Sequence, residues 1–384
     1  MVNAGPRRIL FLIPVAVLAC AAAAWTEEIP WEWTGVEKVV VVGDLHGDYE
    51  NFVKILQSTG VVDEDLHWAA KNAHFVQTGD ILDRGLEARK ILDLLIHLEK
   101  EAQAAGGMVH VLLGNHEEMN LTGIVFTSNP DYVTLDQFIS FLPDGYRKKQ
   151  EDELTRRLIR LRAKNPNQDL KEAIDAFWKP LRADPSAQKL YVLNLNDEYG
   201  PWLRRLNVAI KINDVVYVHG GISEKYSKWG LKEINDRYRM ELTAICRSLL
   251  RGSEPPMIGQ PTILYRGDSP LWYRELATVP EADLKEEVDA ILANLGARAM
   301  VIAHTPTVPK TARDMQRFDG RVWIVDTGIN TRVYGGRPSA LIIQNGDFHV
   351  WGVDHESDNS RSGPAYSPLF TARAGLWGAV PVAR

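Results

Sequence analysis

Short runs of consecutive apolar residues alternate along this chain with segments in which apolar residues recur every three or four positions. Runs of the first kind are typical of buried strands, and segments of the second kind are typical of amphipathic helices. The predicted strands are 39–43, 75–76, 108–113, 215–218, 299–303, 322–325, 340–343 and 348–350. The helical spacing is clearest at 52–56 and 91–98. The pattern indicates an α/β fold with two sheets packed between helices and an antiparallel hairpin around Asn345-Gly346.

A long segment between the strands that end near 113 and 218 has a different pattern. It is helical and highly charged at 146–164 and 170–181, and we expect residues 125–205 to form an inserted helical cap. From Arg147 to Arg182 the segment has eleven Lys and Arg against six Asp and Glu, which is typical of a solvated helix face. Its aromatic residues are expected to fill the core of the cap, with some of the cap beside any ligand that the protein binds: Tyr146, Phe177, Trp178, Tyr191, Tyr199 and Trp202.

The composition of the 384 residues limits the classes of function. A formal net charge of −6 argues against a general nucleic-acid binder, which normally carries a basic face. Two cysteines, Cys20 and Cys246, cannot form a thiolate zinc site. We therefore expect any metal to be held by His, Asp, Asn or Glu.

The two ends of the chain are predicted to lie outside the main folded domain. Arg7 and Arg8 precede an apolar run and the small residues Ala22 to Ala24, a pattern typical of a cleaved signal peptide over 1–24. Export to the periplasm or the medium is expected, and contact with a membrane only through an uncleaved segment or a lipid on Cys20. The main folded domain is predicted at 36–355, followed by a loop-like tail at 356–384.

Five apolar runs end in polar motifs of one type. These motifs are Gly43-Asp44-Leu45-His46-Gly47, Gly79-Asp80-Ile81-Leu82-Asp83-Arg84-Gly85, Gly114-Asn115-His116-Glu117, His219-Gly220-Gly221 and His304-Thr305-Pro306. Because ligands bind at the carboxyl ends of strands in open α/β sheets, we expect these residues to converge. Asp, Asn and His without thiolates suit Mn, Fe, Zn or Mg, and paired ions are the arrangement used for displacement at phosphorus.

In this order, the blocks Gly-Asp-x-His-Gly, Gly-Asp-x-x-Asp-Arg-Gly, Gly-Asn-His-Glu and His-Gly-Gly resemble the phosphoprotein phosphatase family of metallophosphoesterases. The stretches 271–274, 325–328 and 334–341 are similar to its Shewanella-like, bacterial-type branch. The resemblance covers residues 38–345 and implies a four-layer α/β/β/α sandwich.

The resemblance also implies a role for each motif residue. It implies two divalent metal ions per chain, with ligands Asp44, His46, Asp80, Asn115, His219 and His304, of which Asp80 bridges. His116 would be the general acid for the leaving oxygen, oriented by Asp83. Arg84 would bind the phosphoryl oxygens with Asn115 beside it, and a second arginine would be Arg274 or, as an alternative, Arg266.

The implied function is hydrolysis of phosphomonoesters, as a protein phosphatase acting on phosphotyrosine, phosphoserine or phosphothreonine. A hydroxide shared by the two ions would attack phosphorus directly. The substrate is a phosphorylated protein or a small phosphomonoester, and the insert is larger than in the common eukaryotic serine/threonine enzymes, so their preference does not transfer. Two alternatives stay open: a phosphodiesterase or dinucleoside polyphosphate hydrolase with the same centre, and a non-catalytic module that binds phosphorylated partners. The sequence does not indicate the oligomeric state.

Overall fold

The computed structural model describes residues 29–167, 169–253 and 262–353. The predicted signal peptide at 1–24 and the predicted tail at 356–384 lie outside these described residues. From Trp31 on, the described chain forms one compact unit. A search of the described helices for one long and apolar enough to cross a bilayer gives none.

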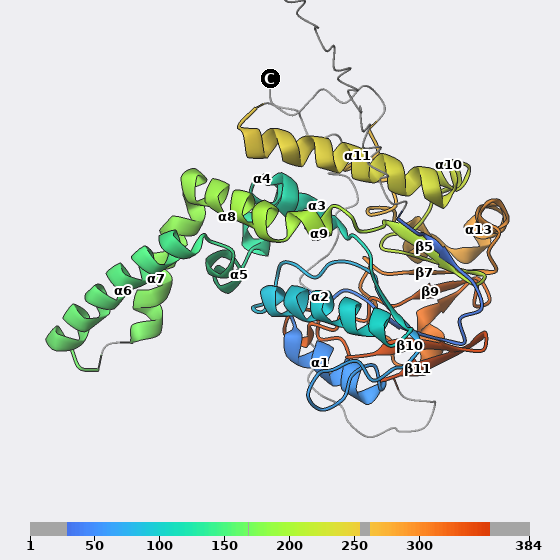
Figure 1. The fold of residues 1–384 in the computed structure, drawn as a ribbon, viewed down its shortest axis with the longest axis horizontal. Helices are drawn as coiled ribbons and strands as arrows, with labels where there is room; N and C mark the ends of the chain where they lie inside the picture. The colour runs from blue at the N-terminus through green and yellow to red at the C-terminus, as the bar shows by residue number, and fades with distance from the viewer. Residues whose placement is uncertain (1–28, 168, 254–261, 354–384) are drawn as a thin grey trace, which may run out of the picture. The chain divides into compact units, whose positions relative to one another are not determined.

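The described chain forms two β-sheets (Figure 1). The five-stranded sheet contains, in spatial order, β11 (Asp347–Trp351), β10 (Ala340–Gln344), β2 (Lys38–Val42), β3 (His74–Gln77) and β4 (Met108–Val111). The six-stranded sheet contains β1 (Glu32–Trp33), β5 (Ala209–Ile212), β6 (Val215–Val218), β7 (Ala299–Ile302), β9 (Val322–Ile324) and β8 (Gln316–Arg317).

Three neighbouring strands in each sheet run parallel. They are β2, β3 and β4 in one sheet and β6, β7 and β9 in the other. All the strands predicted from apolar runs are present, and β10 and β11 form the predicted antiparallel hairpin. Asn345 and Gly346 turn it with φ angles of 52° and 91°, the left-handed region that two-residue hairpin turns require.

The side chains of one strand show how the layers are stacked. Val39 and Val41 of β2 lie in a core cluster shared by the two sheets, whereas Val40 and Val42 lie in the larger cluster that includes the helices. This alternation is expected for a strand buried on both faces. Helices α1 (Tyr49–Ser58) and α2 (Ala88–Ala104) lie beside the five-stranded sheet, as Figure 1 shows.

Other helices cover the six-stranded sheet. They are α10 (Glu224–Ser227), α11 (Gly230–Arg251) and α13 (Glu281–Leu295) (Figure 1). The predicted α/β class with two sheets between helical layers is therefore confirmed. Shorter elements complete the described chain: α12 (Glu275–Thr278), η2 (Ala312–Met315) and α14 (Thr331–Tyr334).

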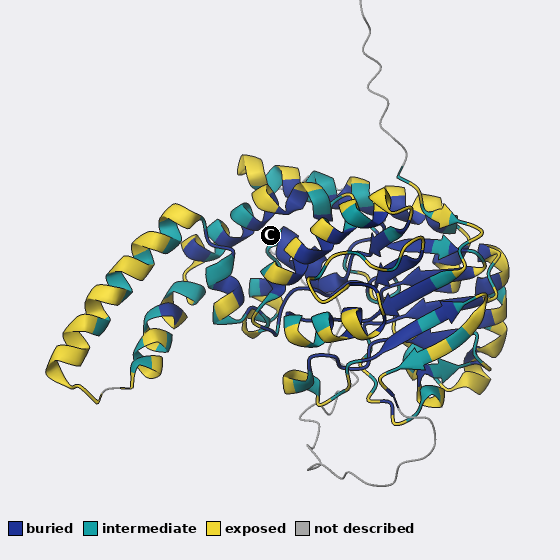
Figure 2. Ribbon diagram, turned by 60° about the horizontal axis from the view of Figure 1, so that its bottom comes forward, coloured by how far each residue is buried: buried dark blue, intermediate teal, exposed yellow. Residues whose placement is uncertain are grey.

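The described chain between β4 and β5 consists mainly of helices joined by short connections. It contains α3 (Asn115–Thr122), α4 (Val125–Ser128), η1 (Pro130–Tyr132), α5 (Leu135–Ser140), α6 (Asp144–Lys164), α7 (Leu170–Ala183), α8 (Pro185–Glu198) and α9 (Gly200–Leu203). Helix α6 has no buried residue, and α7 buries only Trp178 among its described residues. Helix α8 buries a full face, so the insert has an exposed part and a buried part (Figure 2).

Candidate metal and phosphate site

The strand-end motifs converge at the carboxyl ends of the six parallel strands. Loops after β2 and β3 carry Asp44, His46 and Asp80, and the start of α3 after β4 carries Asn115. His219 follows β6 and His304 follows β7. Each of these side chains is buried, with at most 4% of the residue exposed. The structure thus brings together all six residues that the sequence indicated as metal ligands.

The backbone of these loops is strained where the functional residues lie. Five non-glycine residues of the motifs have positive φ angles: His46, Asp80, Asp83, Arg84 and His304. Such conformations are rare outside glycine and gather at functional sites, where the surrounding structure holds them. Gly114 shows how close the loops approach, because a Cβ atom there would lie 2.3 Å from the amide nitrogen of Asp80.

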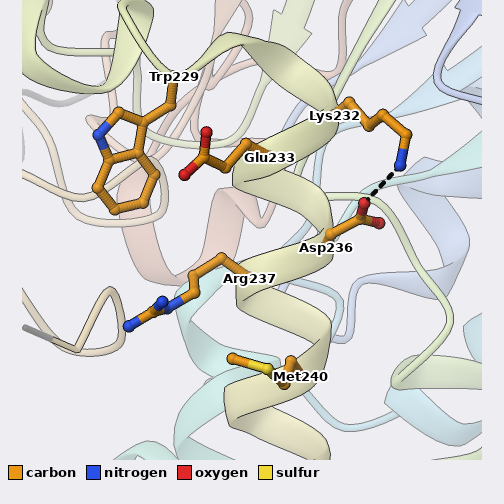
Figure 3. A pocket seen from close by; sticks show the side chains of 6 residues that line it. All are labelled: Trp229, Lys232, Glu233, Asp236, Arg237 and Met240. Atoms are coloured by element: carbon orange, nitrogen blue, oxygen red, sulfur yellow. Dashed lines mark hydrogen bonds and ion pairs between the residues drawn. The ribbon is translucent and has the colours of Figure 1, made fainter. Parts of the chain in front are cut away.

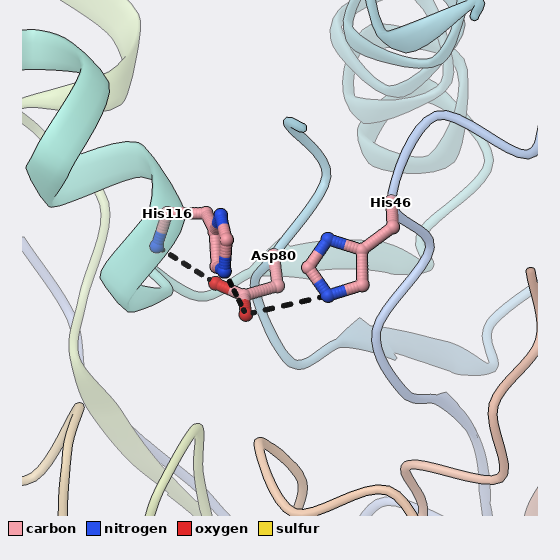
Figure 4. Close-up of side chains that lie close together, drawn as sticks. All are labelled: His46, Asp80 and His116. Carbon is pink, nitrogen blue, oxygen red and sulfur yellow. Dashed lines mark hydrogen bonds and ion pairs between the residues drawn. The ribbon is translucent and has the colours of Figure 1, made fainter. Parts of the chain in front are cut away.

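Asp80 lies at the centre of the site. Its Oδ2 is 3.4 Å from His219 Nε2 and 3.8 Å from His46 Nε2. On a third side, His116 Nε2 is 3.9 Å away (Figure 4). Two groups of potential metal ligands result, Asp80 with His46 and His116, and Asp80 with His219 and His304. Asp80 is the residue that the two groups share.

The imidazole rings are oriented so that one nitrogen of each faces this centre. His46 Nδ1 lies 2.9 Å from the carbonyl oxygen of Leu82, and His219 Nδ1 lies 2.9 Å from that of Thr78. With Nδ1–H donating to these carbonyls, each Nε2 presents a lone pair to the site. This is the outer hydrogen bond that fixes the tautomer of metal-binding histidines.

The donor set around His219 fits a divalent cation. His219 Nε2 is 3.0 Å from Asn115 Oδ1 and 3.2 Å from His304 Nδ1. Burial holds the pKa of His304 well below its usual range, so its ring is neutral. Two ring nitrogens and an amide oxygen therefore point toward one another in a dry pocket, an arrangement that a cation stabilises.

A pair of buried carboxyl groups on the other side of the site also fits a cation, because a cation would stabilise their negative charge. Asp44 lies beside Asp326, and burial together with this second carboxylate raises the pKa of Asp44 well above its usual value. Burial raises the pKa of Asp326 to about 6. The sequence analysis did not assign Asp326 to the site, although it follows the apolar run of β9 as the other site residues follow their strands.

His116 forms a short hydrogen bond with a buried carboxylate. Its Nδ1 lies 2.6 Å from Asp83 Oδ2, while its Nε2 accepts from Arg84 Nη2 at 3.3 Å. Neither His116 nor Asp83 is more than 2% exposed. Asp83 therefore fixes the ring so that Nε2 faces the site, the orientation that a proton donor to substrate needs.

The Asp83 carboxylate is held by residues that the sequence did not identify. Asn120 Nδ2 donates to Asp83 Oδ2 at 2.9 Å, and Gln137 Nε2 donates to Asp83 Oδ1 at 2.8 Å. Gln137 Oε1 also accepts from the Asp83 amide at 2.6 Å. The Tyr191 hydroxyl joins the two amides, lying 2.8 Å from Gln137 Nε2 and donating to Asn120 Oδ1 at 2.7 Å. Gln137 and Tyr191 belong to the insert, and no motif in the sequence indicates this role for them.

Glu117 fixes the loop that carries Asp80. Its carboxylate is fully buried and accepts from the amides of Asp80 and Gly114 through Oε2, at 2.8 and 3.0 Å. Oε1 accepts from the amides of Ile81 and Leu82, at 2.9 and 3.0 Å. Four backbone donors on one carboxylate hold the strained turn in place.

Arg84 lies between two aromatic rings. Its guanidinium carbon is 4.7 Å from the ring centre of Tyr132 and 5.3 Å from that of Tyr334. The Tyr132 ring is also 5.1 Å from the ring of His116. Both tyrosines are partly exposed, so a cation with aromatic neighbours stands at the entrance to the site.

The two candidates for the second arginine lie in different places. Arg274 donates to the carbonyl oxygen of His304 at 2.6 Å, and burial lowers the pKa of its guanidinium although nearby carboxylates oppose the shift. Arg266 is exposed and forms an ion pair with Asp268 at 3.1 Å. Arg274 is therefore the arginine that lies beside the metal-type residues.

A separate open hollow lies along the first turns of α11 (Figure 3). It is lined by Trp229, Lys232, Glu233, Asp236, Arg237 and Met240. Lys232 and Asp236 form an ion pair across one turn at 2.8 Å. None of the strand-end residues reaches this hollow, so it is separate from the candidate site.

Comparison with known proteins agrees with this geometry. A profile of the family "Calcineurin-like phosphoesterase" matches residues 37–308, which is most of the chain and includes all six metal-type residues. The chain belongs to the calcineurin-like phosphoesterase family. Its members use divalent metal ions, and the groups of buried His and Asp residues in this chain offer ligands for such ions.

Relatives of this phosphoesterase also indicate its branch. It is 24% identical to Shewanella-like protein phosphatase 1 of Plasmodium berghei, over 84% of this chain and 75% of that protein. It is 28% identical to Shewanella-like protein phosphatase 2 of Arabidopsis thaliana, over 70% of this chain and 66% of that protein. The predicted resemblance to the Shewanella-like branch is confirmed.

A solved structure has a similar fold. The crystal structure of a cold-active protein-tyrosine phosphatase from a psychrophilic Shewanella species is 28% identical, with a TM-score of 0.58, and the match covers 84% of this chain and 80% of that one. With these relatives named as phosphatases, the chain is a metal-dependent phosphatase. The two alternatives, a phosphodiesterase and a non-catalytic binding module, are not favoured.

Proposed function

We propose that this phosphatase removes phosphate from proteins, with phosphotyrosine among its substrates, and that it uses two divalent cations that share Asp80. The observation that carries the proposal is the position of Arg84, which lies between the rings of Tyr132 and Tyr334 and donates to His116 Nε2. One place then offers a cation for the phosphoryl group, a proton donor for the leaving oxygen and aromatic walls for the leaving group.

The donor sets support two cations rather than one. Asp44, His46 and Asp80 would hold one ion, and Asp80, Asn115, His219 and His304 would hold the other. Oxygen and imidazole ligands without thiolate suit Mn, Fe, Zn or Mg. When bound, such cations supply Lewis acidity toward the phosphoryl group and toward the water that attacks it.

His116 would deliver the proton that the reaction requires. As the bond between phosphorus and the leaving oxygen breaks, that oxygen takes the proton from His116 Nε2. Asp83 accepts from Nδ1 at 2.6 Å and so holds the ring with Nε2 toward the substrate. The charge of Asp83 also stabilises the imidazolium that must form before transfer, the role of the orienting carboxylate in other acid–base pairs.

The two arginines would bind phosphoryl oxygens that the cations do not neutralise. Arg84 is held by its backbone, because its amide donates to the carbonyl of Tyr132 at 2.7 Å. Arg274 is held by the His304 carbonyl and by Thr305 Oγ1 at 3.1 Å. Fixed guanidinium groups stabilise the developing charge of the transition state without reorganising during the reaction.

Aromatic walls favour an aryl leaving group. Aromatic rings pack against one another with a gain of about 0.5–1.5 kcal/mol beyond area burial. The relative with a solved structure is named a protein-tyrosine phosphatase, which supports the same substrate class. Phosphoserine and phosphothreonine peptides fit the same metal centre and would gain less from Tyr132 and Tyr334.

A panel of peptides tests this function. Matched peptides with phosphotyrosine, phosphoserine or phosphothreonine would be assayed with added Mn, Zn, Fe or Mg, against Tyr132→Leu and Tyr334→Leu. We expect each variant to lose about five- to tenfold in kcat/KM on phosphotyrosine and less on phosphoserine, as loss of about 1 kcal/mol predicts. Tyr146→Leu in α6 is the matched control, because this partly buried tyrosine is not among the residues of the site described above. Equal losses on both peptides would contradict the aromatic-wall role, and no activity on any peptide would contradict the function.

Metal counting tests the shared ligand. Asp80→Asn should lose at least one ion per chain together with turnover, because a neutral amide cannot hold two cations as a carboxylate does. Retention of both ions and of the wild-type rate would contradict the assignment of Asp80.

We also propose that the mature protein is exported to the periplasm or the medium. The support is Arg7, Arg8, the apolar run after them and Ala22 to Ala24, which lie outside the described residues. Sequencing the N-terminus of protein from its native host should give a start near Trp25, or a lipid on Cys20. An intact Met1 on cytoplasmic protein would contradict export.

A further inference from the structure

A second group of metal-type side chains lies on the surface of this phosphatase, away from the strand ends. His97 and Glu101 occupy one face of α2, four residues apart, and His67 reaches them from the loop between α1 and β3. Potential ligand atoms of the three residues lie within 4.8 Å of one another. None of the three takes part in the catalytic site described above.

We propose that His67, His97 and Glu101 form a surface site for a divalent cation of the zinc class. Two imidazoles and one carboxylate are donors that zinc accepts, and a water molecule would complete four ligands. The cation would tie the loop between α1 and β3 to α2.

The distances within the group suit such an ion. Glu101 Oε1 is 2.7 Å from His67 Nδ1 and 3.1 Å from His97 Nε2. Tetrahedral zinc with ligands at about 2.0–2.1 Å separates them by about 3.3 Å. The carboxylate oxygen therefore needs to move away from the His67 and His97 nitrogens by about 0.6 and 0.2 Å, with each ring keeping a proton on its other nitrogen.

The carboxylate is already oriented by an outer hydrogen bond. The backbone amide of Trp68 donates to Glu101 Oε2 at 2.8 Å, which leaves Oε1 for the two histidines. Partners of this kind fix the ligands of protein metal sites and tune their affinity. The same hydrogen bond lowers the pKa of Glu101, so the carboxylate is ionised near neutral pH.

The loop that carries His67 is fixed before any ion binds. Asp63 Oδ1 accepts from the backbone amides of Asp65 and His67, at 3.0 and 2.9 Å. Val62 and Trp68 form an antiparallel β-bridge that closes the loop. A preorganised loop loses little conformational entropy on binding, which favours affinity.

The histidines are accessible, as a site filled from solution requires. Their side chains are 60% and 50% exposed for His67 and His97, and that of Glu101 is 28% exposed. An exposed hydrogen-bonded cluster with no affinity for metal is the competing description, and counting bound zinc distinguishes the two.

The experiment uses the full chain with its catalytic centre loaded. Wild type, His97→Ala, the double variant His67→Ala/His97→Ala and the control His349→Ala are equilibrated with Zn²⁺, dialysed together and analysed for zinc per chain. His349 is an exposed histidine on β11 with no place in the cluster. We expect wild type and His349→Ala to hold one more zinc per chain than the two cluster variants.

A second measurement and the rate locate the lost ion. Turnover of a small aryl phosphate should be equal in all four proteins. The second measurement is unfolding in the presence of Zn²⁺ at a concentration one hundred times its Kd. Under this condition the ratio of folded to unfolded protein should rise about 100-fold more in wild type than in the double variant. Equal zinc counts in all four proteins would overturn the proposal. A lower count accompanied by loss of turnover would place the ion at the catalytic centre and would overturn it as well.

Discussion

The helical insert between β4 and β5 has two parts that meet the catalytic residues in different ways. The inner part, made of η1, α5 and α8, supplies Tyr132 beside Arg84 and the buried Gln137 and Tyr191 behind Asp83. The outer part, the hairpin of α6 and α7, buries only Trp178 among its described residues. Both parts belong to one continuous insertion, yet among its described residues only those of the inner part contact groups that the reaction uses.

Some of the charged side chains of the outer part form ion pairs with near neighbours in the chain. Glu153 accepts from both Arg156 and Arg157, each at 3.0 Å, and Lys171 pairs with Asp175 at 3.1 Å. Exposed pairs of this type contribute about 0.2–1 kcal/mol each. They stabilise the helices of the hairpin and make no contact with the site, which agrees with a solvated face.

Two arginines of the outer part connect it to the inner part, and one of them is Arg147 of α6, which donates to the carbonyl oxygen of Ser140 in α5 at 3.4 Å. Arg182 near the end of α7 donates to the carbonyl of Val133 at 2.9 Å and forms an ion pair with Asp131 at 3.0 Å. These contacts lie next to Tyr132. The ends of the parallel strands thus carry the catalytic residues. The inner part of the insert instead holds Asp83, which orients His116, and places Tyr132 beside Arg84.

The largest expected effect tests the group that the inner part supports. His116→Asn should keep its metals and lose about 10²- to 10⁴-fold in turnover on alkyl phosphates, because no proton reaches the leaving oxygen. Activated aryl phosphates need little protonation and should lose much less. Metal analysis and kcat on both substrate types provide the check, and equal losses on both would argue against the role of His116 as an acid.

A buried acid on the other side of α3 tests stability rather than rate. Glu118 accepts from Trp272 Nε1 at 2.7 Å, and burial raises its pKa to about 7 from an ordinary 4.5. Between these values the folded protein binds more protons than the unfolded chain. The contribution of Glu118 to the free energy of unfolding is therefore complete below pH 4.5 and is lost as pH rises through 7.

The expected size of that change is about 3 kcal/mol of unfolding free energy for a shift of this size. Glu118→Gln keeps an acceptor for Trp272 and cannot ionise. The variant should therefore not show the fall in unfolding free energy that Glu118 causes as pH rises. Denaturant unfolding at several values of pH from 5 to 8 measures it. Parallel pH profiles for the variant and wild type would show that Glu118 does not titrate in this range.

A variant of the inner part should change the rate through His116. Gln137→Leu removes the donor to Asp83 Oδ1 and the acceptor for the Asp83 amide, and we expect about 10- to 100-fold lower kcat with KM little changed. Gln188→Leu is the matched control, because the Gln188 amide donates only to the Arg182 carbonyl in the same insert.

Combination with the acid variant separates positioning from folding. If Gln137 acts through His116, Gln137→Leu should cost nothing further in the His116→Asn background. An equal loss in both backgrounds would mean that the substitution damages the fold or another step.

The catalytic strand ends could be predicted from the sequence because their signal is local. Asp44, Asp80 and His219 each stand within four residues after an apolar run, and parallel strands of a sheet bring such ends together. Asp326 follows β9 in the same way and lies in the stretch 325–328 that resembles the Shewanella-like branch, but this resemblance alone assigns it no role as a ligand.

The inner part of the insert could not be predicted in this way. Gln137 and Tyr191 are separated by α6 and α7, and only in the folded chain does Gln137 contact Asp83 and Tyr191 contact Gln137. An isolated Gln or Tyr in a helix carries no pattern of its own. Strands β1 and β8 were missed for another reason, since two residues each are too few to show an alternating pattern.

The smallest expected effect belongs to the outer hairpin. Replacing residues 160–174 with a short Gly/Ser linker removes its tip but keeps the contact of Arg157 with the Phe177 ring, 5.0 Å away, and keeps the anchor at Arg182. Because the removed residues touch none of the catalytic groups, turnover of a small aryl phosphate and the ratio of phosphotyrosine to phosphoserine activity should stay within about twofold of wild type, the range of an exposed change of about 0.5 kcal/mol. Steady-state assays on the two peptides, with unfolding curves to show that the linker variant folds, measure both quantities. A changed ratio in a folded variant would mean that the hairpin tip contacts the peptide around the phosphorylated residue, and substrate choice would then depend on the outer part as well as on Tyr132 of the inner part.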